Sequence, residues 1–199
     1  MELIVSTAVL LMIASFVVAN FRAGQQNSEL RAVARQVSDG ISAARIMTLG
    51  GQIVADPAAP GTKKFPDGGF GVAMVDLTLD PTNSNRLVLF GDFDSDGINN
   101  GTSELIANGL VSLSKVDFTE FCALEASTVG SSIPCDSSWV SLGHSLTIIF
   151  SAPGVTQATY SATGITPTYV GGVFKHQKTG RQGYFYVSLA SGLIFSQEL

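Results

Sequence analysis

Charged and catalytic side chains are scarce in this chain of 199 residues. Lys, Arg, Asp and Glu together make up 14% of it, and it has only two histidines and two cysteines. We find no nucleophile paired with a base, no phosphate-binding loop and no convincing pair of catalytic carboxylates. These absences argue against an enzyme and favour a structural or binding role.

Close to its start, the chain has a long run with no charge and no proline. The nineteen residues from Leu3 to Phe21 carry no charge, and the first proline is Pro57. At a rise of ~1.5 Å per residue, nineteen helical residues span roughly 28 Å, about the thickness of the hydrocarbon core of a bilayer. Glu2 precedes the run and Arg22 follows it. A carboxylate beside such an apolar segment needs a cation close to it.

Three interpretations of this apolar run are open. A cleaved secretory signal would suit the small residues Val18 and Ala19, but it requires a basic start and this start is acidic. A single-pass membrane anchor agrees with the length. The third is a helix that first lies in a membrane and then packs into a filament, and the residues that follow favour it.

The apolar run continues into an amphipathic segment that ends at Gly50-Gly51, a stop signal for a helix. We therefore predict one helix over about 2–49, roughly 70 Å long, whose first half is apolar all round. That half must be buried by something other than this chain's own core. The apolar residues of the second half recur at steps of three and four, the spacing of one helix face: Leu30, Val33, Val37, Ile41 and Ala44.

The remainder of the chain is rich in Val, Ile, Leu, Phe and Tyr between clusters of turn residues, which indicates β structure. We expect loops over 55–69, 127–138 and 151–167. A helix that covers an antiparallel sheet gives the class α+β. The predicted parts are a filament-core or transmembrane half-helix (1–24), an amphipathic half-helix (25–50) and a β-rich head (51–199). The expected strands are 69–79, 86–90, 110–118, 140–150, 168–174, 183–189 and 192–195.

The head is acidic. Seven Lys and Arg stand against thirteen Asp and Glu after residue 50, a net charge of −6. An acidic head keeps assemblies soluble and argues against phosphate binding over most of its surface.

The opening sequence MELIVSTAVLLMIASFVVANFRAG, with its amphipathic continuation, resembles the type IV pilin superfamily. The resemblance implies an N-methylated start, a glutamate just inside it, here matched by Glu2, and an apolar helix that carries a β-rich head. Only Met1 precedes Glu2, where the family usually has four residues. Either the processed start lies upstream of Met1, which we expect, or Met1 is itself the processed terminus.

The head is similar to the H-type pseudopilin and FimT-like branch of that superfamily. The resemblance is carried by RLVLFGDFDSDGINNGTSELI, SLTIIFSAPG and the closing GRQGYFYVSLASGLIF. It implies a pilin that forms a type IV pilus-like filament on the cell surface. The alternative is a minor pilin or pseudopilin of a DNA-uptake or type II secretion machine.

The resemblance also implies the partners: copies of the chain itself, the inner membrane before assembly, a prepilin peptidase and the assembly machinery. No enzymatic activity is expected. The residues expected to pack between subunits belong to the first half of the helix: Glu2, Leu3, Val9, Leu10, Ile13, Phe16 and Val17.

An acidic motif follows the expected strand 86–90. Asp92, Asp94 and Asp96 alternate and are followed by Gly97, so their carboxylates and the Ile98 carbonyl could surround a hard cation. The bidentate Glu of an EF-hand would fall at Ser103, whereas Glu104 comes one residue later. We predict a structural Ca²⁺ site formed by Asp92, Asp94, Asp96, Ile98 and Glu104. The alternative is a solvated, Asx-rich turn.

Cys122 and Cys135 are expected to form one disulfide in an exported head. A metal site would need further ligands, and neither His144 nor His176 has the spacing of one. A pair of free thiols in the cytosol is the remaining alternative.

One basic cluster surrounds the sequence QKTGRQG and contains Lys175, His176, Lys178 and Arg181. Gly180-Arg181 resembles the basic motif of FimT-like proteins that take up DNA, although Gly183 stands in place of the second Arg. A solvated hairpin tip is the simpler interpretation. Contact of Lys175, Lys178 and Arg181 with DNA is therefore considered but not favoured.

Overall fold

The computed structural model describes most of the chain. Among the residues given next, the side chains of 2–4, 19, 22–23, 107–108, 155, 160 and 197–198 are not described. The described residues are 2–56, 59, 61–75, 84–99, 104–113, 115–124, 135, 139–152, 155–160 and 167–198.

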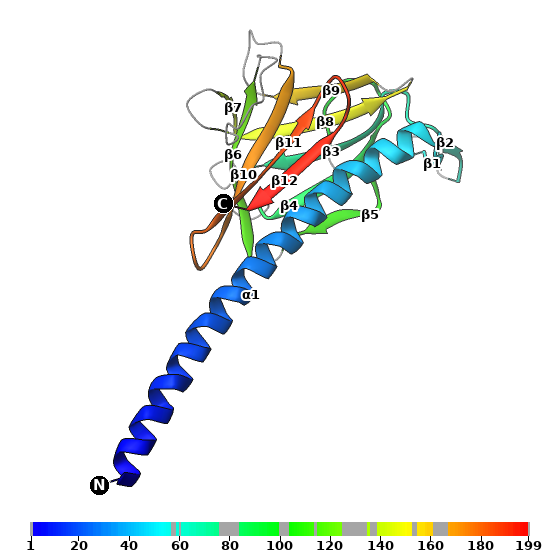
Figure 1. Cartoon of the computed structure of the whole chain (residues 1–199). Coiled ribbons are helices and arrows are strands. Elements are labelled where there is room, and N and C mark those ends of the chain that lie inside the picture. The colour runs from blue at the N-terminus through cyan, green and yellow to red at the C-terminus, as the bar shows by residue number, and fades with distance from the viewer. Residues whose placement is uncertain are drawn as a thin grey trace.

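Helix α1 (Glu2–Leu49) has 48 residues, and its two halves have different surroundings. The first half projects away from the strands, whereas the second half lies across them (Figure 1). The five apolar residues spaced along one face of the second half are all buried in the core, which confirms that prediction. They are Leu30, Val33, Val37, Ile41 and Ala44, each at most 3% exposed.

Two glycines end α1. Gly51 adopts φ 58°, a left-handed conformation that glycine reaches without steric cost. The Gln52 N–H donates to the Met47 carbonyl at 3.0 Å and the Gly51 N–H to the Thr48 carbonyl at 3.1 Å. These two bonds form a Schellman motif, which satisfies carbonyls that the helix end would leave free.

Two five-stranded antiparallel sheets and one small ribbon make up the head. The ribbon pairs β1 (Val54–Ala55) with β2 (Lys63–Lys64). The first sheet has the order β5-β4-β3-β8-β9 and consists of β3 (Gly69–Val75), β4 (Arg86–Asp92), β5 (Leu105–Ser112), β8 (Ser145–Ser151) and β9 (Val155–Tyr160). The second sheet has the order β12-β11-β10-β6-β7 and consists of β6 (Val116–Leu124), β7 (Val140–Gly143), β10 (Tyr169–His176), β11 (Gln182–Ser188) and β12 (Ile194–Glu198).

The predicted class, α+β with a long helix packed on one antiparallel sheet, is wrong. The structure is mostly β, with 45% strand in three sheets. Of the two halves of α1, the first has its described side chains exposed. Only the second packs on the head, against β3, β4 and β8 of the first sheet and β11 and β12 of the second. Alternation along a strand shows which residues face a core, but it does not show which strands share a sheet.

The core lies between the second half of α1 and both five-stranded sheets. Ile41 belongs to the same buried cluster as Phe70 and Met74 of the first sheet and Phe118 and Phe185 of the second. All five are at most 2% exposed. The helix therefore joins the two sheets into one hydrophobic core.

Two predicted strands and two predicted loops need correction. The expected strand 110–118 spans the end of β5 and the start of β6, and 140–150 is divided into β7 and β8 at Gly143, which has φ 89°. The expected loop 151–167 contains β9, and the expected loop 55–69 contains β2. The expected loop 127–138 lies outside the described residues, except for residue 135.

Candidate functional site

The described side chains in the first half of α1 form an exposed apolar surface. We call residues 5–21 of α1 the apolar stem. Its large apolar side chains are each at least 51% exposed: Val5, Val9, Leu10, Leu11, Met12, Ile13, Phe16, Val17, Val18 and Phe21. Monomeric soluble proteins rarely expose contiguous apolar patches of more than a few hundred Å². The stem is therefore suited to packing against another apolar surface.

The residues predicted for assembly fall in two groups. Glu2 and Leu3 lie in the first turn of α1, and their side chains are outside the described part of the structure. The others are exposed on the stem: Val9, Leu10, Ile13, Phe16 and Val17. In the part of the chain that the structure describes, no helix contains a stretch long and apolar enough to cross a bilayer.

Beyond the stem, helix α1 meets the head at a polar contact. The Lys115 Nζ lies 2.5 Å from Glu29 Oε1, and the His176 Nε2 lies 3.0 Å from Glu29 Oε2. The backbone N–H groups of Lys178 and Thr179 approach His176 Nδ1, each at 3.3 Å. Nδ1 is thus an acceptor, so the ring proton is on Nε2 and points at the Glu29 carboxylate.

Hydrogen bonds from two partners shift the titration of Glu29. Lys115, followed by His176, lowers the pKa of this carboxyl below its ordinary value of 4.5. Beside this contact, Arg181 donates from Nη1 to Asn27 Oδ1 on the helix. We call Glu29, Lys115 and His176 the neck contact, because it ties the helix to the head just where the stem leaves it.

The acidic motif occupies the loop after β4. Asp92 is the last residue of β4, and its carboxylate lies with those of Asp94 and Asp96 so that one oxygen from each is within 4.8 Å of the others. Asp92 is 2% exposed, whereas Asp94 and Asp96 are exposed. The structure therefore brings together the three carboxylates that the spacing predicted.

Backbone N–H groups hold this loop in place. Gly97 donates to Asp92 Oδ2 at 3.2 Å, Asp96 donates to Asp94 Oδ1 at 3.3 Å, and Ile98 donates to Asp96 Oδ1 at 2.8 Å. Gly97 adopts φ 77°, so a side chain at this position would be strained. The loop is thus folded around its own carboxylates.

Asp92 is the unusual member of the group. Its Oδ1 atom is buried and has no hydrogen-bond partner among the described residues. Burial raises the pKa of the Asp92 carboxyl, the backbone N–H groups of Gly97 and Ser95 oppose this rise, and the nearby Asp94 carboxylate adds to it. A buried acceptor without a partner carries a desolvation cost, and a cation at Oδ1 would remove it.

Glu104, the fifth predicted ligand, does not join the other carboxylates. It is 4% exposed, and its Oε1 accepts the Phe93 N–H at 3.2 Å. Its backbone carbonyl accepts the Gly91 N–H at 3.0 Å. Glu104 therefore holds the two sides of the β4–β5 hairpin together instead of contributing to the group of Asp92, Asp94 and Asp96.

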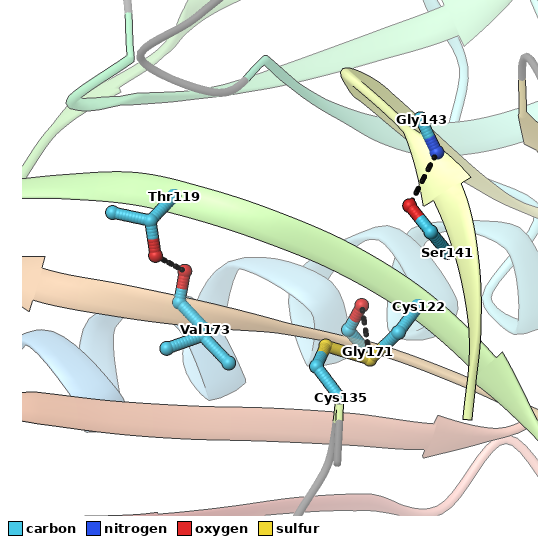
Figure 2. Close-up of a disulfide and its surroundings, with 7 residues drawn as sticks. All are labelled: Thr119, Cys122, Cys135, Ser141, Gly143, Gly171 and Val173. Atoms are coloured by element: carbon cyan, nitrogen blue, oxygen red, sulfur yellow. Dashed lines mark hydrogen bonds between the residues drawn. A yellow bond between two sulfur atoms is a disulfide. The ribbon is translucent and has the colours of Figure 1, made fainter. Parts of the chain in front are cut away.

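Cys122 of β6 and Cys135 form a disulfide, with their Cα atoms 5.3 Å apart (Figure 2). Cys122 Sγ lies 3.8 Å from the Gly171 carbonyl oxygen of β10. Because a disulfide sulfur has no hydrogen to donate, this is a packing contact. Both cysteines belong to a small hydrophobic cluster with Trp139, beside the main core. The disulfide ties Cys135 to β6 of the second sheet.

The basic residues considered for DNA lie at one hairpin tip. Lys175, Lys178 and Arg181 are exposed at the turn between β10 and β11. Arg181 also donates to Asn27, so one of the three side chains contacts the helix. His176, the remaining residue of this basic cluster, is 2% exposed and belongs to the neck contact.

The neck contact was not predicted from the sequence. Glu29 and His176 are 147 residues apart in the chain, and neither lies in a recognisable motif. One signal was present, because His176 lies two residues after Phe174 and one after Lys175, so the two-residue period of a strand turns it to the same side as Phe174. No family model, curated protein or solved structure matches this chain.

Proposed function

We propose that this chain is a structural subunit of a type IV pilus-like filament, and that it assembles by packing its apolar stem against the stems of other copies. The observation that carries the proposal is the exposure of the ten large apolar side chains of the stem. The resemblance of the first 24 residues to pilins supports the same conclusion. In such a filament the stems form the dry centre and the heads lie outside, at the cell surface.

The energetics favour this arrangement. Removing apolar surface from water contributes ~25 cal/mol per Å², so full burial of one Val, Leu, Ile or Phe side chain contributes about 1.5–3 kcal/mol. A hollow at the end of the stem is open to a side chain from a neighbouring helix, and it is lined by Phe16, Val17, Asn20, Phe21, Gly24, Gln25 and Ser28. A polar substitution on the stem should therefore weaken assembly without unfolding the head.

Glu2 is the one acid next to the apolar run. In a packed apolar centre its carboxylate needs a cation, which a neighbouring subunit would supply. We expect Glu2→Ala to reduce filament yield while the head keeps its melting temperature.

A pair of matched substitutions in one helix tests the proposal. Ile13 on the stem is 55% exposed, and Ile46, which lies over the head, is 69% exposed. In cells that produce the full chain, we expect Ile13→Asn to reduce the filaments recovered by shearing and ultracentrifugation at least tenfold. Ile46→Asn should leave the yield close to that of the unsubstituted chain, with electron microscopy showing filaments of constant diameter.

Circular dichroism of both variants would check that the head stays folded. Filaments at the normal yield from Ile13→Asn would contradict the proposal, and so would an unsubstituted chain that never forms filaments.

A further inference from the structure

The acidic loop after β4 has no role in the proposed filament contact, since that contact uses the stem of α1. We propose that this loop binds one Ca²⁺ ion through the carboxylates of Asp92, Asp94 and Asp96. The Ile98 carbonyl is a further ligand by its spacing from these residues. The inference concerns a different part of the molecule from the proposed function and does not depend on it.

Asp92 distinguishes this loop from an ordinary acidic turn. In a solvated turn, water satisfies the carboxylate oxygens, but Asp92 is 2% exposed and its Oδ1 has no hydrogen-bond partner among the described residues. Buried polar atoms in native proteins nearly always have a partner. The atom that lacks one here belongs to a carboxylate grouped with two others, and a cation is the partner that satisfies all three.

The spacing of the oxygens agrees with Ca²⁺. Two oxygens bound to the same Ca²⁺ at 2.3–2.6 Å are at most about 4.6–5.2 Å apart. One oxygen from each of Asp92, Asp94 and Asp96 lies within 4.8 Å of the others. The separations of the three carboxylates are therefore within the span of the ligands of a single Ca²⁺ ion.

The surroundings already fix the buried ligand. A Cβ atom on Gly68 would lie 2.1 Å from Asp92 Oδ2, so the backbone of Gly68 packs directly against this carboxylate. The Gly97 N–H also donates to Asp92 Oδ2. With Oδ2 held on both sides, Oδ1 is the oxygen left for the ion. Such preorganisation reduces the ordering cost of binding.

The ion would connect the loop to the rest of the first sheet. A Cβ atom on Gly97 would lie 3.2 Å from Thr159 Oγ1 of β9, so the loop rests against a strand at the far edge of the sheet from β5. Ca²⁺ at this position cancels the repulsion of three neighbouring negative charges and fixes the β4–β5 connection. Its role is structural.

Ca²⁺ fits better than Mg²⁺ for a chemical reason. Mg²⁺ requires near-ideal octahedral geometry at 2.0–2.1 Å and gives up its water reluctantly, whereas Ca²⁺ accepts six to eight oxygens in a flexible arrangement. A short loop that supplies three carboxylates from alternate residues forms the flexible arrangement of Ca²⁺ more readily than the strict octahedron of Mg²⁺.

Calorimetric titration of the full chain tests the inference. The protein is held monomeric in a non-ionic detergent, freed of metal with a chelator, and titrated with CaCl₂ in 0.1 M KCl. We expect one Ca²⁺ per chain, with Mg²⁺ binding at least tenfold more weakly. Asp94→Asn and Asp96→Asn, at exposed positions, should each weaken Ca²⁺ binding at least tenfold. The matched control is Asp39→Asn, an exposed aspartate on α1.

Thermal unfolding of the same samples provides the second readout. A ligand that binds only the folded state raises the melting temperature, so Ca²⁺ should raise it for the unsubstituted chain and for Asp39→Asn but not for Asp94→Asn. No saturable binding up to millimolar Ca²⁺ would overturn the proposal, and so would Asp94→Asn binding as tightly as the unsubstituted chain. Equal affinity for Mg²⁺ would overturn the assignment to Ca²⁺. Because detergent keeps the stems apart, none of these results depends on filament assembly.

Discussion

The His176 Nε2 lies 3.0 Å from Glu29 Oε2 and joins the end of strand β10 to helix α1. The ring is 2% exposed, and its Nδ1 accepts backbone N–H groups, so Nε2 donates to the carboxylate. Lys115 contacts the other Glu29 oxygen at 2.5 Å. This carboxylate therefore determines how firmly the helix is held at the point where the stem leaves the head.

The first prediction concerns the pH dependence of this contact. The pKa of Glu29 is lowered in the folded chain, so its stabilising effect is complete above its ordinary pKa of 4.5 and is lost as pH falls through the lower folded value. We expect the melting temperature to fall below about pH 4.5, and to fall less steeply in Glu29→Gln, which has no charge to lose. Scanning calorimetry from pH 7 to pH 3 measures the difference.

Glu120→Gln is the matched control, because Glu120 is an exposed acid on β6. Its acid transition should follow that of the unsubstituted chain. If Glu29→Gln also followed it, the neck contact would have no part in acid stability.

The second prediction compares two isoleucines in the second half of α1, Ile41 and Ile46, which differ in burial. Ile41 is fully buried between the two sheets, and Ile46 is 69% exposed. We expect Ile41→Ala to lower the free energy of unfolding by about 2–5 kcal/mol, because it leaves a cavity in the core. Ile46→Ala should change it by no more than about 0.5 kcal/mol.

Urea unfolding followed by circular dichroism measures both values. Since the two variants make the same replacement in the same helix, helix propensity affects them alike. A similar loss from both would mean that the buried face of α1 is assigned wrongly.

The third prediction concerns the disulfide. Cys122 and Cys135 are 13 residues apart, and a cross-link closing a loop of about 15 residues stabilises a fold by ~3 kcal/mol. We expect a thiol reductant to lower the urea midpoint of the unsubstituted chain by an amount equivalent to about 3 kcal/mol. The double variant Cys122→Ala/Cys135→Ala should start lower and should not respond to the reductant. An unsubstituted chain whose midpoint is unchanged after complete reduction would contradict this.

Local patterns in the sequence were enough for several features. The three- and four-residue spacing of the apolar residues from Leu30 to Ala44 identified the buried face of α1, because that face follows from helix geometry alone. The alternation of Asp92, Asp94 and Asp96 likewise placed three carboxylates together, since only a few residues of one loop decide their positions.

Features that depend on long-range pairing could not be predicted in the same way. The helix packs on two sheets rather than one. The second sheet depends on the pairing of β10 with β6, and the 44 residues or more between the paired positions give no local sign of this pairing. Strand β9 was missed because its Ser, Thr and Gly-rich surroundings resemble a loop, although it pairs with β8 along its length. The partners of Glu29 are His176, at the end of β10, and Lys115, just before β6, both far along the chain.

The last prediction concerns a close approach of backbones in the second sheet. Gly171 lies in β10 between β6 and β11, and a Cβ atom there would be 2.4 Å from the Phe185 carbonyl oxygen. Because that oxygen belongs to the backbone of a paired strand, it cannot move aside as a flexible side chain would. We expect Gly171→Ala to lower the free energy of unfolding by about 1–3 kcal/mol.

Gly24→Ala provides the contrast. Gly24 lies in α1 just beyond the stem, and nothing is within 4 Å of a Cβ atom placed on it. Alanine favours a helix by up to ~1 kcal/mol over glycine, but this part of α1 does not pack on the head. The urea midpoint of the head should therefore stay the same in Gly24→Ala while helical circular dichroism is kept or rises. If Gly171→Ala were as stable as the unsubstituted chain, the pairing of β10 with β11 at Gly171 would have to be different.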